Sequence, residues 1–371
     1  MPKTARLAGV AIAVAACHGN GDEARPLPVR SVSSTGAAVS AEPSLPRSEP
    51  PSPGTYRFVG RAVDEPGGGI RFAWSGSRIE TRFVGTSLDV ELEDDGTNAF
   101  EIVLDGTVMP HLRTSRGDRT YRVVEGAAPG EHALVLSKRT EAMAGEVVFH
   151  GFHAGPFGRL LKPGDGPRRR LEIIGDSITA GMGNEGTDPC PPSADNQNSF
   201  ATYGEIAARA LAADVINIAW SGVRTSGPSP TMADLYPLAL PRRRDSAWKF
   251  PADAPDAVVV NLGDNDDFSS ARARDAFGVD YIRFVRGIRG RYPNSLIACT
   301  TGPMSVGSSE AARQTISAAI GSIGDARIFY LEFAPIDPRS EQVGCFEHPT
   351  VKTHSRMAET LVAAVRGRLH W

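Results

Sequence analysis

In the first part of the chain, apolar residues recur at every second position over short runs. The runs 88–92 and 132–136 alternate cleanly, and turn residues such as Asp95-Gly96 separate such runs at close spacing. A period of two is typical of β-strands that bury one face. The pattern predicts an antiparallel jelly-roll β-sandwich over residues 55–160. We expect it to be a structural platform that shapes one wall of an active site, with sugar binding as the alternative.

After a linker rich in Pro, Gly and Arg, the pattern changes to short, nearly unbroken apolar runs that alternate with helical stretches. The runs lie at residues 171–174, 215–219, 257–262, 296–298 and 328–331, and the helical stretches include 202–213, 275–291 and 353–368. Apolar strands separated by helices indicate a parallel sheet that is covered on both faces. Residues 170–371 are therefore predicted to form a three-layer α/β domain.

The first seventeen residues have the pattern of an export signal. Lys3 and Arg6 precede an apolar stretch of about ten residues, which is half of a membrane span and suits a signal peptide. The small residues before Cys17 resemble the cleavage box of bacterial lipoproteins, in which this cysteine carries the lipid. We expect export, either as a lipoprotein anchored to the cell envelope through Cys17 or, after an ordinary signal peptide, as a secreted protein.

Residues 18–54 are rich in Pro, Ser, Ala and Glu and are expected to form a disordered linker. The whole chain is 41% apolar and 22% charged, which is typical of a soluble globular protein. Its 40 basic and 43 acidic residues leave no excess of positive charge for nucleic acid. We expect no nucleic-acid partner, a monomer, and membrane contact only through the lipid on Cys17.

The segment 171–181 is the most informative stretch, because an apolar strand enters it and glycines surround its polar centre. In Gly175-Asp176-Ser177 the serine would stand at the carboxyl end of a buried strand, where α/β sheets bind ligands. Ser177 is the candidate nucleophile. The alternative is a polar strand-to-helix turn in which Asp176 or Ser177 is only an N-cap.

Three more polar segments complete the chemistry of acyl transfer. Gly222 follows the second strand of the α/β part, Asn265 follows the third, and His348 lies near the C-terminus. A serine nucleophile needs a base, and the oxyanion that forms needs hydrogen-bond donors. We assign His348 as the base. The predicted oxyanion hole consists of the backbone N–H groups of Ser177 and Gly222 and the side-chain amide of Asn265.

Each segment also has a simpler interpretation. Gly222 alone could be a turn glycine and Asn265 alone an Asx turn. The acidic residues around Asn265 could suggest a cation site, but the spacing lacks the glycine and the distal glutamate of a calcium loop, so no metal is expected. His354 falls on the last predicted helix, where packing is a more common role than catalysis.

In this order, Ser177, Gly222, Asn265 and His348 resemble the four blocks of the SGNH (GDSL-like) hydrolases. The chain resembles carbohydrate esterase family 2 still more closely, over nearly all of its globular part. The similar segments are 71–77, 138–142 (Lys-Arg-Thr-Glu-Ala), 175–184, 219–222 and 348–358. The resemblance implies a jelly roll followed by an SGNH domain, no cofactor, and deacetylation of polysaccharides such as acetylated xylan and glucomannan.

Two departures from the family pattern affect the site. Asp264 stands where the family usually has threonine, and Phe346-Glu347 replaces an Asp-Trp pair. Because an acid facing an oxyanion would oppose it, we expect Asp264 to point away or to accept a backbone hydrogen bond. The lost tryptophan removes a sugar-stacking surface. Trp220, Trp248 and Phe346 are the candidate substitutes, with core packing as the alternative for each; Trp220 is our substrate-binding candidate.

The acid that would orient His348 is missing, since no aspartate lies two or three residues before it. Either Glu347 turns inward as the third member of a triad, or a backbone carbonyl orients the ring of a Ser–His dyad. Adjacent residues of an extended loop point in opposite directions, so Glu347 is poorly placed to reach the ring. This favours the dyad.

Cys190, Cys299 and Cys345 remain after Cys17, an odd number for an exported protein. A disulfide between Cys299 and Cys345 would attach the loop that contains His348, here called the histidine loop, to the sheet. Cys190 would then be free or paired with another chain. Other pairings stay open. Two other functions also stay open: a carbohydrate-binding lipoprotein whose esterase site is inactive, and an esterase of acetylated bacterial envelope glycan.

Overall fold

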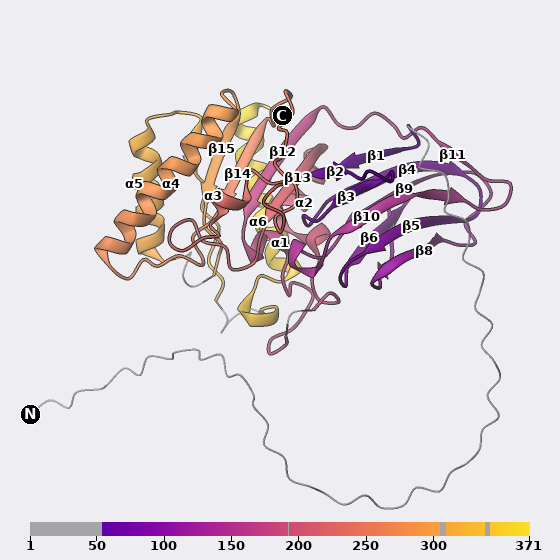
Figure 1. Cartoon of the computed structure of the whole chain (residues 1–371). Helices are drawn as coiled ribbons and strands as arrows, with labels where there is room; N and C mark the ends of the chain where they lie inside the picture. Colours follow the sequence, from indigo (N-terminus) through magenta and orange to yellow (C-terminus); the bar gives the residue numbers. More distant parts are fainter. Residues whose placement is uncertain (1–53, 192, 305–308, 338–341) are drawn as a thin grey trace, which may run out of the picture. The chain divides into compact units, whose positions relative to one another are not determined.

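The computed structural model describes residues 54–191, 193–304, 309–337 and 342–371, all within one compact unit, Glu49–Trp371 (Figure 1). The predicted signal peptide, the lipid anchor on Cys17 and the linker up to residue 53 lie outside the described residues. They remain predictions. In the part of the chain that the structure describes, no helix is both long and apolar enough to cross a membrane.

The N-terminal part consists of two antiparallel sheets, as the period of two predicts. The first has the order β1 (Tyr56–Val59), β4 (Arg78–Val84), β9 (Glu131–Lys138), β6 (Ala99–Leu104), β7 (Thr107–Arg113), with β11 (Arg159–Leu161) also on β4. The second has the order β2 (Ala62–Asp64), β3 (Ile70–Phe72), β10 (Val147–Ala154), β5 (Leu88–Asp94), β8 (Gly117–Val124). Alternate residues of β4 and β5 are buried and join one core rich in phenylalanine. This confirms the predicted sandwich.

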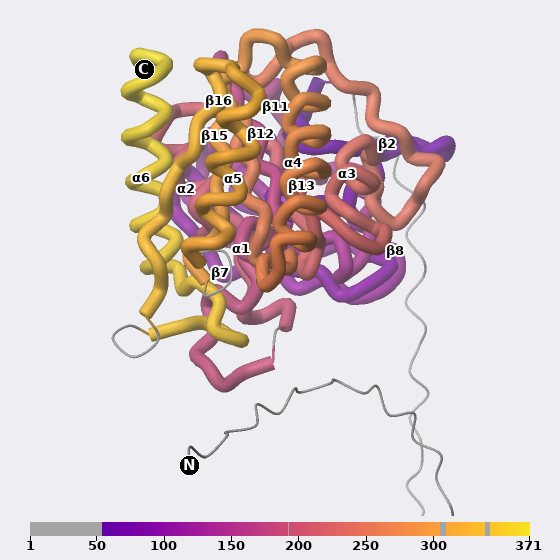
Figure 2. Tube along the Cα trace, turned by 90° about the vertical axis from the view of Figure 1, so that its left-hand side faces the viewer, coloured from indigo at the N-terminus to yellow at the C-terminus, as the bar shows by residue number. Residues whose placement is uncertain are grey.

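The C-terminal part is a parallel sheet with helices on both faces, which confirms the predicted α/β class. Its strand order is β13 (Ala213–Ala219), β12 (Arg169–Gly175), β14 (Ala257–Asn261), β15 (Leu296–Thr300), β16 (Ile328–Tyr330). One face packs on α2 (Tyr203–Ala210) and α6 (Val351–Leu369), the other on α4 (Ala271–Arg291) and α5 (Glu310–Ile323). In Figure 2 the strands separate α6, in yellow, from α4, in orange.

The chain order reverses between β12 and β14, because β13 lies on one side of β12 and the later strands lie on the other. In open parallel sheets, ligands bind beyond the carboxyl ends of the strands at this reversal point. The short helix α1 (Ser177–Ala180) begins there, directly after β12. The topology therefore places Ser177 where a ligand site is expected.

The sandwich and the α/β domain share part of their core. Trp74, which follows β3, is completely buried in the same apolar cluster as Ile174 of β12 and Ile218 of β13. Its indole Nε1–H donates to the carbonyl of Leu238 at 3.4 Å. A fully buried tryptophan removes roughly 150–250 Å² from water. The two domains are thus joined by core packing, so loops of the sandwich have fixed positions relative to the sheet ends.

Candidate active site

Ser177 lies at a tight strand-to-helix turn. Asp176 caps α1 by accepting a hydrogen bond from the Ile178 N–H at 3.0 Å. A Cβ atom at Gly175 would collide with the Thr179 side chain, so this close turn requires glycine. The alternative capping interpretation therefore holds for Asp176, and it leaves the Ser177 hydroxyl available for other contacts.

His348 contacts that hydroxyl directly, although 171 residues separate the two in the sequence. Its Nε2 lies 2.8 Å from the Ser177 Oγ. Only 7% of Ser177 and 8% of His348 is exposed, so the pair is largely shielded from water. Burial lowers the pKa of His348, and hydrogen bonds to the carbonyls of Phe346 and Cys345 raise it only in part. The imidazole is therefore neutral near pH 7 and can accept a proton through Nε2.

The other ring nitrogen of His348 faces the backbone. Nδ1 lies 3.0 Å from the carbonyl oxygens of both Cys345 and Phe346. A carbonyl only accepts, so Nδ1 carries the hydrogen and Nε2 has the free lone pair that a base needs. Glu347 is exposed and has a positive φ of 59°. The local geometry is that of the predicted dyad, with Glu347 turned to solvent.

Gly222 and Asn265 flank Ser177, because their strands β13 and β14 are the two neighbours of β12. The Asn265 amide nitrogen donates to Asp176 Oδ2 at 3.2 Å, which leaves its second N–H available for a ligand. The Trp220 N–H donates to the Gly175 carbonyl at 3.2 Å and ties the turn of Gly222 to that of Ser177. The sheet thus gathers the predicted oxyanion donors at one edge.

Asp176 has a second role that the sequence did not reveal, because it also orients Asn265. Burial, and then the nearby charge of Asp264, raise the pKa of Asp176 well above its ordinary value. Asp264 itself accepts the Gly302 N–H at 2.7 Å, which confirms the expected backbone hydrogen bond. Its charge is therefore engaged on the side of the neighbouring strand β15. Among the described residues, no group of three or more His, Cys, Asp or Glu is arranged to hold a metal ion.

We expect Asn265→Ala to lower kcat for an aryl acetate by about 10²-fold or more, with a smaller change in KM. A donor of an oxyanion hole acts mainly when charge develops in the transition state. Steady-state kinetics of the purified variant measure the two constants separately. A change confined to KM would assign Asn265 to substrate binding instead.

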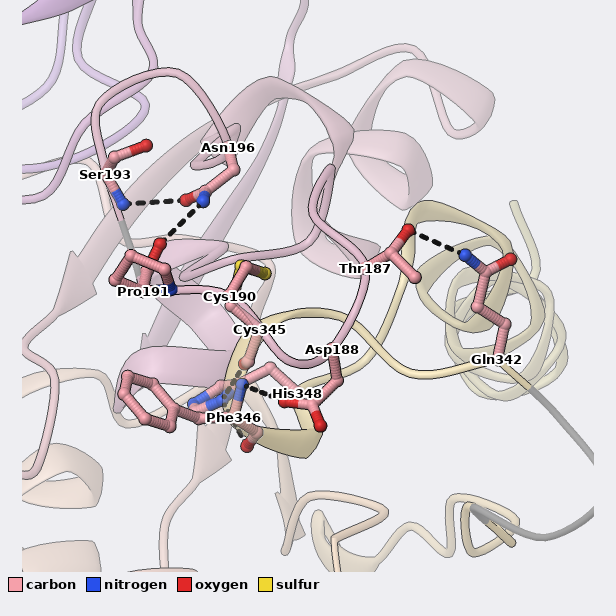
Figure 3. Close-up of a disulfide and its surroundings, with 10 residues drawn as sticks. All are labelled: Thr187, Asp188, Cys190, Pro191, Ser193, Asn196, Gln342, Cys345, Phe346 and His348. Carbon is pink, nitrogen blue, oxygen red and sulfur yellow. Dashed lines mark hydrogen bonds between the residues drawn. A yellow bond between two sulfur atoms is a disulfide. The ribbon is translucent and has the colours of Figure 1, made fainter.

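The predicted disulfide between Cys299 and Cys345 is wrong. Cys345 pairs with Cys190, and their Cα atoms lie 4.9 Å apart (Figure 3). Cys299 is a free, fully buried residue of β15 whose side chain belongs to the core beneath α4 and α5. The histidine loop instead leads into α6, which covers the opposite face of the sheet. The disulfide therefore joins the histidine loop to the segment that follows Ser177.

The remaining candidates have different surroundings. His354 lies within α6, almost completely buried, and its Nδ1 accepts the Tyr203 N–H at 3.2 Å, which confirms a packing role. Trp220 is partly buried against the core, and Trp248 lies by the Arg61 guanidinium at 5.6 Å. Phe346, beside His348, is 58% exposed. Of the three aromatic candidates, Phe346 presents the most open surface next to the Ser–His pair.

Comparisons with known proteins agree with this architecture. The family model "Carbohydrate esterase 2 N-terminal" matches residues 58–163, and the "GDSL-like Lipase/Acylhydrolase family" model matches residues 173–356. The "Cellulase/esterase CelE" of Acetivibrio thermocellus is 37% identical over 313 residues, 82% of this chain and 38% of that protein. An "Acetylxylan esterase / glucomannan deacetylase" of Cellvibrio japonicus is 29% identical over 317 residues, 78% of this chain and 84% of that protein.

A solved structure gives the same result at the level of the fold. It is a family two carbohydrate esterase from Clostridium thermocellum in complex with cellohexaose, 37% identical, with a TM-score of 0.81. The similarity covers 85% of this chain and 99% of that one. A sandwich of the carbohydrate esterase 2 type followed by a GDSL-like α/β domain places the fold in the class of the GDSL-like lipases and acylhydrolases. The chain belongs to carbohydrate esterase family 2.

Proposed function

We propose that this protein is a serine esterase that removes O-acetyl groups from polysaccharides of the acetylated xylan and glucomannan class. The observation that carries the proposal is the 2.8 Å contact between His348 Nε2 and Ser177 Oγ. The choice of substrate is supported by the family and by the acetylxylan esterase relatives, which are named for that activity.

In the proposed reaction, Ser177 Oγ attacks the acetyl carbonyl carbon while His348 Nε2 takes the hydroxyl proton. The carbonyl oxygen becomes an oxyanion held by the N–H groups of Ser177 and Gly222 and the amide of Asn265. The C–O bond to the sugar then breaks, and His348 returns the proton to the sugar oxygen. Water, activated by the same histidine, releases acetate from the acetyl-enzyme and regenerates Ser177.

The activity should fall in acid with an apparent pKa below 6.5, the ordinary value of histidine, because burial lowers the pKa of His348. Protonated imidazole cannot accept the serine proton, so kcat/KM is full above this pKa and is lost as the pH falls through it. A pH profile with an aryl acetate measures the midpoint, and melting curves at each pH separate it from unfolding. A midpoint above 6.5 would contradict the assignment of this buried ring as the base.

The substrate is tested by acetate release from acetylated xylan, acetylated glucomannan and O-acetylated peptidoglycan, with Ser177→Ala as the blank. Release from the plant polysaccharides at well above the rate on peptidoglycan is the expected result. The reverse preference would support the envelope-glycan alternative. Binding of the glycans without acetate release, together with no hydrolysis of an aryl acetate, would support the alternative of a carbohydrate-binding protein whose esterase site is inactive.

A further inference from the structure

A carboxylate from the sandwich domain holds the residue that precedes Gly222. Glu141 follows β9, and its Oε2 accepts the Ser221 N–H at 3.0 Å. Its Oε1 accepts the Ser221 hydroxyl at 2.8 Å. Both oxygens of one carboxylate are therefore used on a single residue of the other domain, next to the proposed oxyanion donor.

The carboxylate itself is buried and firmly supported. Only 7% of Glu141 is exposed. The buried Lys138 Nζ donates to the carbonyls of Glu141 at 3.0 Å and of Thr140 at 2.9 Å, which fixes the backbone of this loop. Ala142, the next residue, is packed in the core that the two domains share. The backbone that carries Glu141 is therefore held rigidly where its side chain contacts Ser221.

Burying a carboxylate is unfavourable unless its hydrogen bonds replace water. Burial raises the pKa of Glu141, and the hydrogen bonds from Ser221 act in the opposite direction. Ser221 is held by its backbone N–H and by its hydroxyl at the same time, so the geometry of the two hydrogen bonds fixes the residue.

Ser221 and Gly222 are the two central residues of a tight turn. The Val223 N–H donates to the Trp220 carbonyl at 3.1 Å, and Gly222 has a φ of 76°. A positive φ at the third position is typical of a type II turn, whose central peptide is flipped relative to type I. That central peptide carries the Gly222 N–H. Holding Ser221 from outside the turn therefore selects the direction in which this N–H points.

We propose that Glu141 is a positioning residue for catalysis, through which the sandwich domain fixes the Gly222 N–H of the oxyanion hole. The inference rests on the proposed function, since it assigns Glu141 to the same oxyanion hole. Under this proposal the sandwich domain helps to stabilise the transition state, whereas a purely structural platform would not.

The test compares Glu141→Ala, Glu141→Gln and Glu141→Asp by kcat and KM on a small aryl acetate. The alanine variant should lose about 10²-fold in kcat with little change in KM, in line with the loss of one oxyanion donor. Glutamine keeps the length and can accept from the Ser221 N–H while donating to its Oγ, so it should recover most of kcat. Aspartate keeps the charge but is one methylene shorter and should recover much less.

Asp214→Ala is the matched control. Asp214 is also a carboxylate between the two domains. It lies on β13, the strand that leads into the turn, but at the other end of that strand, where it accepts from Arg57 at 2.7 Å. The Asp214→Ala substitution should lower the melting temperature and leave kcat within about twofold, because Asp214 accepts from Arg57 and Arg78 and not from the turn of Gly222.

A folded Glu141→Ala protein with kcat near wild type overturns the inference. If that variant does not fold, the other two decide. A kcat for Glu141→Gln well above that for Glu141→Asp supports positioning by geometry. Equal kcat values, or a higher value for Glu141→Asp, overturn it. Ser177→Ala, measured alongside, separates the two levels: its activity near wild type would reject the proposed site itself, and its inactivity beside an unaffected Glu141→Ala would reject only the role of Glu141.

Discussion

Ser177→Ala should lower the hydrolysis of an aryl acetate by about 10⁵-fold or more while the protein stays folded. No other group takes over a covalent step once the nucleophile is removed, so the loss should fall on kcat. The substitution removes one hydrogen bond, to His348 at 2.8 Å, which contributes about 1 kcal/mol to stability. The melting temperature should therefore shift by only a few degrees.

Ser295→Ala is a suitable control for this variant. Ser295 is also a buried serine whose hydroxyl makes a hydrogen bond, to the Pro255 carbonyl, but it precedes β15 at the amino ends of the strands. It should lose similar stability and keep full activity. Residual activity of folded Ser177→Ala at more than a few per cent of wild type would remove Ser177 from the nucleophile position.

Most of the fold could be predicted from the sequence, because the hydrophobic pattern differs between the two domains: a period of two in the sandwich, and apolar runs that alternate with helical stretches in the α/β domain. The expected helix at 275–291 corresponds to α4, which begins earlier, at Ala271, because the Ser270 hydroxyl accepts the Ala273 N–H. The expected helix at 353–368 likewise corresponds to α6. Helix α5 lies between the expected strands at 296–298 and 328–331, but no bounds were predicted for it, since its buried residues are alanine and isoleucine spaced among small polar residues. Periodicity indicates a helix only where the apolar stripe is strong.

The arrangement of the site was predictable in so far as it follows from strand order. Parallel strands end at one edge, so Ser177, Gly222 and Asn265 could be grouped from their positions after apolar runs. The pairing of Cys345 could not be derived in this way. Both faces of β15 are buried, so alternation along the strand does not reveal toward which layer Cys299 points.

Contacts between the two domains could not be predicted from the sequence, for a different reason. Residues 138–142 were noted only for their similarity to a family motif, and nothing in their spacing connects Glu141 to Ser221, eighty residues later. Docking of two domains depends on the shape of both surfaces, here on the burial of Trp74 in the common core. Local patterns do not encode that shape.

Replacing Glu347 and His348 separately should give very different results, and the difference decides between a dyad and a triad. His348→Ala should remove nearly all activity, because no other base contacts the Ser177 hydroxyl in the described part of the chain. Glu347→Ala should cost less than about tenfold in kcat/KM, whereas disabling the true acid of a serine protease triad costs about 10⁴-fold. The reason is structural: Nδ1 of His348 is already held by two carbonyls at 3.0 Å.

Two further measurements make this comparison specific. The pH profile of Glu347→Ala should keep the acid midpoint of the wild type, since an exposed carboxylate that does not touch the ring has little effect on its pKa. Glu359→Ala, which removes another exposed carboxylate, on α6, gives the background effect of losing one surface charge. A loss of about a thousandfold for folded Glu347→Ala, together with a shifted midpoint, would make Glu347 the third member of a triad. It would also mean that the histidine loop rearranges when substrate binds, because in the present geometry Glu347 faces solvent.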